Sequence, residues 1–147
     1  MEDLYHQGKL RCIGVCNYTI QHLQDLLATC TIKPMVHQFE LHPLCQQQQL
    51  VEFCQQNGIA IQAYSSLGQG QLVQTPLLIP GLQDICRQVG RTPGQVLLRW
   101  ALQKGYSVLP KSCHAPRIRE NMDLNFTLND EVTLINLCNG FVLPSTC

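Results

Sequence analysis

The stretch CIGVCNYTIQHLQDLLATCTIKPMVHQFEL, residues 12–41, contains one complete unit of strand, helix and strand. Its two ends, residues 12–16 and 35–41, are short runs rich in residues that favour strands. Between them, apolar residues recur at helical spacing, which predicts a helix over residues 19–30. Strands that are joined by a helical crossover run parallel and are covered on both faces, so this stretch predicts an α/β fold.

The same pattern continues along the rest of the chain. Further strands are predicted at residues 59–65 and 106–110, and further helices at residues 46–56, 77–89, 92–104, 116–122 and 129–140. The strongest local signal is Thr92-Pro93-Gly94-Gln95, because Thr caps a helix, Pro fits its first position and Gln closes a capping box. Four strands with their helices fit either a small doubly wound sheet or half of an eight-stranded barrel, and the spacing leaves both open.

Composition bounds the class of protein. The chain has 147 residues, of which 45% are apolar, enough for one core of ordinary size, and we predict a single domain over residues 1–147. Ten basic residues balance ten acidic ones and form no cluster, so nucleic-acid binding is not expected. No apolar run approaches the roughly 20 residues that span a bilayer, and the first residues are acidic, unlike a signal peptide. We therefore expect no membrane segment and a cytoplasmic location.

Nine cysteines are many for this length, but their number is odd and no two are spaced as in a Cys-x-x-Cys pair. Several lie within apolar runs, where a free thiol packs as a small hydrophobic group. We expect reduced core thiols rather than a disulfide framework. The nearest approach to a metal site is His42 and Cys45 with Cys54, which lacks the paired spacing of structural zinc sites, so no metal ligand is predicted.

Polar side chains follow the predicted strands at their carboxyl ends, where α/β proteins bind ligands. Asn17, Gln38 and Tyr64 offer two amides and an aromatic ring, the partners that a flat, amide-bearing ring such as nicotinamide requires. The Lys111-Ser112 pair and Arg117 lie around the start of a predicted helix and offer the cations and hydroxyl group that a phosphate requires. The alternative for each residue taken singly is a structural role in a turn or helix cap.

Four segments resemble, in order, the successive signatures of the aldo-keto reductases: residues 8–18, GKLRCIGVCNY; residues 38–43, QFELHP; residues 63–68, AYSSLG; and residues 110–112, PKS, followed by Arg117, Glu120 and Asn121. The resemblance runs from about residue 2 to about residue 138. It implies an α/β fold of the TIM-type (β/α)8 barrel family, of which this chain would hold about half, strands five to eight with their helices. It also implies an NADP(H)-dependent oxidoreductase that reduces small carbonyl substrates, aldehydes and ketones, to alcohols.

The resemblance also assigns residues to the parts of the cofactor. They are Cys16, Asn17 and Gln38 at the nicotinamide carboxamide, Tyr64 stacked on the ring, Ser65, Leu67 and Gly68 along the pyrophosphate, Lys111, Ser112 and Arg117 at the adenosine 2′-phosphate, and Glu120 and Asn121 at the adenine. A site for the 2′-phosphate favours NADP(H) over NAD(H). Cys16 and Ser66 stand where the family usually has Ser and Pro, and we expect weaker cofactor binding as a result.

The family's catalytic Tyr, Lys, Asp and His belong to the first four strands of its barrel, so the resemblance assigns no catalytic residue here. We expect a fragment or truncated form that is inactive in isolation. An open half barrel exposes strand edges, so we expect self-association or pairing with a complementary half barrel. The alternatives are a catalytically silent isoform, a regulatory NADP(H)-binding module, and a doubly wound nucleotide binder, whose only hint is Gly68-Gln69-Gly70.

Overall fold

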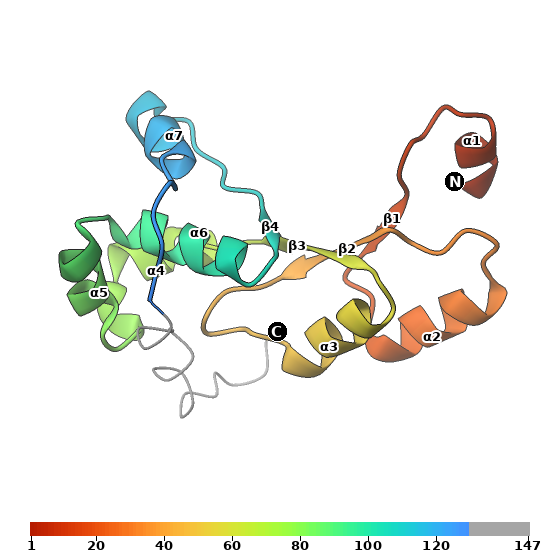
Figure 1. The fold of residues 1–147 in the computed structure, drawn as a ribbon, viewed down its shortest axis with the longest axis horizontal. Coiled ribbons are helices and arrows are strands. Elements are labelled where there is room, and N and C mark those ends of the chain that lie inside the picture. The colour runs from red at the N-terminus through yellow and green to blue at the C-terminus, as the bar shows by residue number, and fades with distance from the viewer. Residues whose placement is uncertain (130–147) are drawn as a thin grey trace. The chain divides into compact units, whose positions relative to one another are not determined.

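The structure is a computed structural model that describes residues 1–129 (Figure 1). The chain divides into two compact units: unit 1 comprises residues 1–39 and 47–62, and unit 2 comprises residues 40–46 and the residues from 63 onward. The four strands are β1 (Gly14–Cys16), β2 (Val36–Glu40), β3 (Ala60–Tyr64) and β4 (Ser107–Val108). Their order in the sheet, β1-β2-β3-β4, equals their order along the chain. The single domain over residues 1–147 stays a prediction.

Unit 1 contains the stretch of strand, helix and strand on which the fold prediction rests. β1 and β2 pair in parallel, with Gly14 opposite Val36 and Cys16 opposite Gln38. The parallel pairing predicted for this stretch is therefore confirmed. The two strands approach closely, since a Cβ at position 14 would lie only 2.4 Å from the carbonyl oxygen of Val36. The pairing requires glycine at this position because any side chain would meet the backbone of β2.

Three helices belong to unit 1: α1 (Glu2–His6), α2 (Ile20–Thr29) and α3 (Gln48–Gln56). α2 begins at a capping box, in which the His22 N–H donates to Oγ1 of Thr19 and the Thr19 N–H donates to Nδ1 of His22. Its apolar face buries Leu23. The helices predicted over residues 19–30 and 46–56 are confirmed, with slightly shorter bounds.

Helix α1 is missing from the sequence prediction because five residues are too few to display a helical period. Hydrogen bonds to the Glu2 side chain connect α1 to the rest of unit 1. That carboxylate accepts the backbone N–H of Thr31 at 2.8 Å and of Ile32 at 2.7 Å, just after α2. These hydrogen bonds lower the pKa of Glu2, because they favour the charged carboxylate.

Unit 2 is built around helix α6 (Pro93–Gln103), which begins at the predicted capping box of Thr92 and Gln95. The other elements are the 3-10 turns η1 (Gly68–Gly70) and η2 (Pro76–Leu78) and the helices α4 (Gln71–Gln74), α5 (Leu82–Val89) and α7 (Ala115–Met122). α6 contacts α4, α5, β4 and α7 (Figure 1), and it buries the apolar side chains of Val96, Leu97, Leu98, Trp100 and Ala101. It therefore positions every one of these neighbouring elements.

Two sequence predictions in unit 2 need correction. The helix predicted over residues 77–89 is interrupted, because Gly81 at φ +75° precedes the first turn and α5 begins only at Leu82. Cys45 is disulfide-bonded, so the expectation of reduced thiols is wrong for that residue. The six other cysteines of the described chain are free, as expected, but Cys12, Cys16 and Cys113 are exposed, so the expectation of core thiols is wrong for those three. The helix predicted over residues 129–140 lies outside the described residues, apart from its first position.

Candidate functional site

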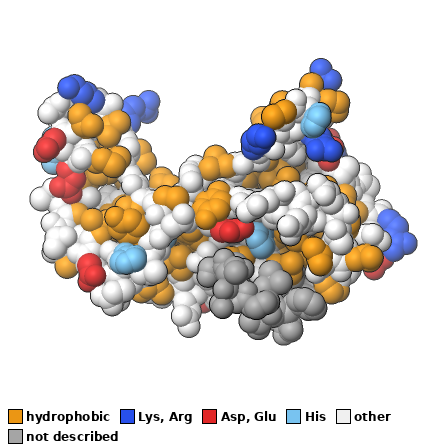
Figure 2. Space-filling view, turned by 180° about the vertical axis from the view of Figure 1, so that it is seen from behind, with side chains coloured by type: hydrophobic (Ala, Val, Ile, Leu, Met, Phe, Trp, Pro, Cys, Tyr) orange, Lys and Arg blue, Asp and Glu red, His pale blue; other side chains and the backbone are white. Residues whose placement is uncertain are grey.

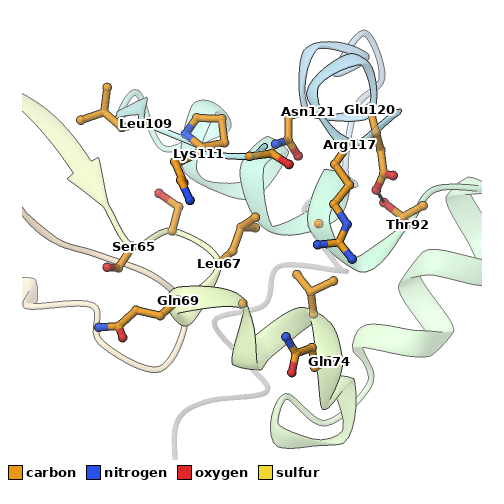
Figure 3. A pocket seen from close by; sticks show the side chains of 16 residues that line it. Ser65, Leu67, Gln69, Gln74, Thr92, Leu109, Lys111, Arg117, Glu120 and Asn121 are labelled. Atoms are coloured by element: carbon orange, nitrogen blue, oxygen red, sulfur yellow. Dashed lines mark hydrogen bonds between the residues drawn. The ribbon is translucent and has the colours of Figure 1, made fainter. Parts of the chain in front are cut away.

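Unit 2 contains a cavity of about 640 Å³ whose walls come from four segments (Figure 3). One wall is the turn after β3 together with α4. The start of α6 forms the second wall, and the third and fourth are the β4–α7 connection and α7 itself. The residues that line it are Ser65, Ser66, Leu67, Gln69, Gly70, Val73, Gln74, Thr92, Gly94, Leu109, Pro110, Lys111, Ser112, Arg117, Glu120 and Asn121.

The cations of the cavity come from the β4–α7 connection and the first half of α7. Figure 3 shows Lys111 directed toward the segment that carries Ser65 and Leu67, and Arg117 directed toward the helix that carries Gln74. Within residues 1–129 neither cation has an ion-pair partner. Ser112 lies between them in sequence, and its hydroxyl accepts the backbone N–H of His114 at 3.1 Å, immediately before α7. Two unpaired cations beside a helix start are well suited to an anion.

The opposite wall is a turn with unusual backbone geometry. Ser65 and Gln69 have positive φ values of +49° and +54°, in the left-handed region that non-glycine residues rarely adopt. Gly68 and Gly70 adopt positive φ values as well, +54° and +93°. Each such non-glycine residue costs on the order of 1–3 kcal/mol, and such strain concentrates where a ligand is held. The turn therefore fits a binding role better than a purely structural one.

The carboxylate and amide of the cavity lie on the last turn of α7. Glu120 accepts a hydrogen bond from the Thr92 hydroxyl at the start of α6, and Asn121 follows it in the helix. Figure 3 shows the Thr92 to Glu120 contact at the edge of the cavity. A carboxylate that accepts hydrogen bonds and an amide that both donates and accepts them match the polar edge of an amine-bearing heterocycle.

The cavity brings together most of the residues that the sequence assigns to the pyrophosphate and adenosine parts of a dinucleotide. They are Ser65, Leu67, Lys111, Ser112, Arg117, Glu120 and Asn121. Gly68 does not line the cavity, although its two neighbours do. Tyr64 ends β3 and does not line it either; its carbonyl accepts the Leu41 N–H at 3.3 Å.

The residues predicted at the nicotinamide carboxamide lie together in unit 1, where β1 ends beside β2. The Asn17 N–H donates to the carbonyl of Gln38 at 2.9 Å, and the Cys16 thiol lies 3.8 Å from the Gln38 amide oxygen. Gln38 in turn donates its amide to Gln62 of β3 at 2.6 Å. Asn17 has a φ of +56°, so the chain turns sharply at this strand end. Two of the predicted carboxamide partners are therefore adjacent and held by backbone pairing.

Sequence reasoning missed the part of the cavity wall that comes from α4 and from the start of α6. Gln69 and Gln74 carry no local motif that marks them. Thr92 and Gly94 belong to the capping box, which predicts a helix start but was not connected to a ligand. Helix starts are frequent sites of anion binding, so the capping box contained a usable signal.

Unit 1 also contains a buried pair of titratable side chains that the sequence analysis did not single out. His37 is 0% exposed, and its Nε2 accepts the backbone N–H of Tyr18 at 3.0 Å. The Cys54 sulfur of α3 lies 3.5 Å from the other ring nitrogen. Burial lowers the pKa of His37 to about 4 and raises the pKa of Cys54 to about 11. Both groups are therefore neutral at pH 7, and His37 fixes the turn that follows Asn17.

The charge of the cavity is a local feature. The chain as a whole has equal numbers of acidic and basic residues, and on the face drawn in Figure 2 the Lys and Arg side chains are spread among uncharged surface. Within residues 1–129, no three His, Cys, Asp or Glu side chains gather as a metal site would require. No helix in this part of the chain is long and apolar enough to cross a membrane.

Comparison with known proteins decides the family. The model of the Aldo/keto reductase family matches residues 1–135. The chain belongs to the aldo-keto reductase family. Among curated members, the glyoxal reductase of Bacillus subtilis is 42% identical over 132 residues, and the NAD(P)H-dependent D-xylose reductase of Scheffersomyces stipitis is 44% identical over 142 residues. These alignments cover 89% of this chain but 46% and 45% of those proteins, so the chain spans about half the length of the relatives it matches.

Solved structures of aldo-keto reductases share the fold of this chain. The enzyme MGS-M4 from a deep-sea metagenome library has a TM-score of 0.88 and 33% identity, with 95% of this chain and 53% of that chain covered. A mutant of Gox0644 in complex with NADPH has a TM-score of 0.85 and 32% identity, with 92% of this chain and 50% of that chain covered. The resemblance to the family and to its barrel fold is therefore confirmed.

The comparisons correct the predicted position within the barrel. They assign the match to the amino-terminal portion of the homologues, about half of their length, so on these comparisons the identification as strands five to eight is wrong. The physical reason is that the eight βα units of such a barrel repeat one pattern of strand, helix and polar strand end, so the pattern does not number them. That numbering was the ground for placing the family's catalytic residues outside this chain, so their absence is no longer inferred.

Proposed function

We propose that this chain binds NADP(H) and serves an oxidoreductase that reduces small aldehydes and ketones to alcohols. The observation that carries the proposal is the cavity of unit 2, which Lys111, Ser112 and Arg117 line together with a strained turn. The chemistry that NADPH supplies when bound is hydride transfer to a carbonyl carbon. The proposal is supported by the family, whose members include reductases named for NAD(P)H or NADPH.

We propose that Lys111, Ser112 and Arg117 of this cavity contact the adenosine 2′-phosphate. A phosphate of this kind carries close to two negative charges, and two cations with a hydroxyl group satisfy both its charge and its acceptor oxygens. We propose that Glu120 and Asn121 contact the adenine and that Ser65, Leu67 and Gly68 pass along the pyrophosphate. None of the residues that line the cavity is Tyr, His or Asp, and we propose that its titratable side chains, Lys111, Arg117 and Glu120, contact the phosphate and the adenine rather than the carbonyl substrate.

In unit 1, Asn17 and Gln38 are proposed to bind the nicotinamide carboxamide, with Cys16 beside them. Tyr64, which belongs to unit 2, is proposed as the residue that stacks on the nicotinamide ring. The support is that β1 and β2 place Asn17 and Gln38 side by side through a backbone hydrogen bond. Pairing with a second copy or with a complementary half barrel, and a cytoplasmic location, stay predictions. Sedimentation velocity of the purified chain tests the first of them.

The test of the proposed function is charge reversal at Arg117, with the affinities for NADPH and NADH measured by isothermal titration calorimetry. Arg117→Glu should weaken NADPH binding at least about tenfold, because it removes a charge-assisted hydrogen bond to the phosphate and adds a repulsive charge. NADH lacks the 2′-phosphate, and its affinity should change far less. The same selectivity is expected for Lys111→Glu.

Arg119→Glu is the matched control, because Arg119 lies on the same helix, is exposed, and does not line the cavity. It changes the net charge equally and should leave the preference for NADPH intact. Equal loss of both cofactors at Arg117, or the same effect at Arg119, contradicts the 2′-phosphate assignment. Binding of NADPH without reduction of any aldehyde supports the alternative of a regulatory cofactor-binding module.

A further inference from the structure

One buried amide joins the two helices whose ends form the adenosine side of the cavity. Gln95 is 5% exposed and lies in the first turn of α6. Its Oε1 accepts the Thr92 N–H at 3.1 Å, which is its part in the capping box. Its Nε2 donates to the carbonyl of Asp123 at 2.8 Å and lies 3.4 Å from the carbonyl of Glu120. The side chain thus caps α6 with its oxygen and holds the end of α7 with its nitrogen.

Two further contacts reach the same end of α7 from the segment that precedes α6. The Thr92 hydroxyl donates to the carboxylate of Glu120, and Arg91 forms an ion pair with the carboxylate of Asp123. The Arg91 guanidinium also lies over the ring of Phe126, 5.1 Å from its centroid. All of these contacts fix the last turn of α7 and the residues just after it. We call this group, Gln95 with Arg91 and Thr92, the α7 clamp.

The capping function alone does not account for Gln95. A capping box needs only an acceptor at this position, and Glu provides one as well as Gln does. The surroundings of the amide nitrogen are, in contrast, acceptors only: the carbonyls of Glu120 and Asp123, with an oxygen of the Asp123 carboxylate at 3.4 Å. A buried donor is required there, because a carboxylate oxygen facing those acceptors would be repelled and left unpaired.

We infer that Gln95 is a positioning residue for cofactor binding: through the α7 clamp it sets the orientation in which α7 presents Arg117, Glu120 and Asn121 to the cavity. The inference rests on the proposed function. Glu120 and Asn121 sit in the clamped turn itself, and Arg117 lies one turn earlier on the same helix. A shift of α7 therefore changes the distance of Arg117 from the strained turn across the cavity, and that distance determines how well the cation reaches a phosphate.

Gln95→Glu separates the two roles of the side chain, because it is nearly isosteric, keeps the capping oxygen and removes the donor. We expect NADPH affinity to fall about tenfold or more and the ratio of NADPH to NADH affinity to fall several-fold, since the phosphate contact of Arg117 exists only with NADPH. Hydrogen exchange of the α7 amides should become faster while the amides of α5 and α6 keep their protection. Gln103→Glu is the control, because Gln103 lies on the same helix and pairs with Leu128 instead of α7.

Arg91→Ala weakens the α7 clamp by removing the ion pair with Asp123, and it buries no charge. It provides a second test of the inference if Gln95→Glu fails to fold. It should lower the same affinity ratio by a smaller factor. An unchanged ratio of NADPH to NADH affinity in a folded variant, with or without faster exchange in α7, overturns the positioning role. If the unaltered chain binds neither NADPH nor adenosine 2′,5′-bisphosphate, the proposed function fails and the inference fails with it; if it prefers NADPH and Gln95→Glu keeps that preference, only the inference fails.

Discussion

Replacing His37 by Gln is predicted to make the stability of the chain less sensitive to acid. His37 is fully buried on β2, and its pKa falls from the ordinary 6.5 to about 4 because burial penalises the charged ring. The groups around it give no compensating negative charge: Cys54 approaches from α3, the Phe39 ring lies 4.7 Å away, and the Tyr18 N–H donates to the ring. Protonation of His37 therefore opposes folding.

The direction and size of the effect follow from proton linkage. Between pH 6.5 and about pH 4 the unfolded chain binds a proton at this residue and the folded chain does not, so the free energy of unfolding falls as the pH falls through that window. The full difference corresponds to about 3 kcal/mol, of which about 2 kcal/mol is lost between pH 7 and pH 4.5. Above pH 6.5 the contribution of His37 is fully present.

Urea unfolding followed by far-UV circular dichroism at pH 7, 6, 5 and 4.5 measures this difference. His37→Gln keeps an acceptor for the Tyr18 N–H but does not titrate, so its unfolding free energy should decline less with acid than that of the unaltered chain. Burial also lowers the pKa of His42, opposed by Glu40, so the readout is the difference between the two proteins rather than either curve. His114→Gln, at an exposed histidine, is the control. Parallel curves for His37→Gln and the unaltered chain would refute the argument.

Two further predictions concern the elements that present the site. Gly14→Ala should lower the free energy of unfolding by about 2 kcal/mol or more, because its Cβ would lie 2.4 Å from a backbone oxygen of β2. Gly94→Ala, at the start of α6, should be neutral or slightly stabilising, because the atom nearest to the new Cβ, Oε1 of Glu120, would be 3.7 Å away. Equal losses of unfolding free energy at the two glycines in urea unfolding would argue against the close strand approach. Thr19→Ala should lower the free energy of unfolding by about 1 kcal/mol, because it removes the capping box of α2. Thr19→Ser keeps the hydroxyl group and should retain most of that stability. Equal unfolding free energies for the two variants would show that the cap does not contribute.

The elements that the sequence predicts well are those specified by neighbouring residues. The sequence predicts α6 at its observed start because Thr92 and Gln95 stand three positions apart and form a cap that depends on nothing else. Likewise it assigns Lys111 and Arg117 together because they flank one helix start. The helix that corresponds to α5 is predicted to begin too early, because the apolar pattern already starts before Gly81, where the backbone turns. A feature that depends on neighbouring residues can be predicted from the sequence, whereas a change in backbone direction within an apolar run cannot.

The remaining part of the site depends on contacts between residues far apart in the chain, and such contacts produce only weak patterns in the sequence. Gln95 is recognisable in the sequence through its oxygen, since the partner of that oxygen, Thr92, is three residues away. Its nitrogen binds carbonyls 25 and 28 residues further on, and a backbone carbonyl is the same group whatever residue carries it. No side-chain pattern therefore marks the partner, and the positioning role becomes visible only when α7 is seen against α6. If Gln95→Glu leaves the preference for NADPH unchanged, the capping box was the whole role of this residue, and the sequence had already revealed it.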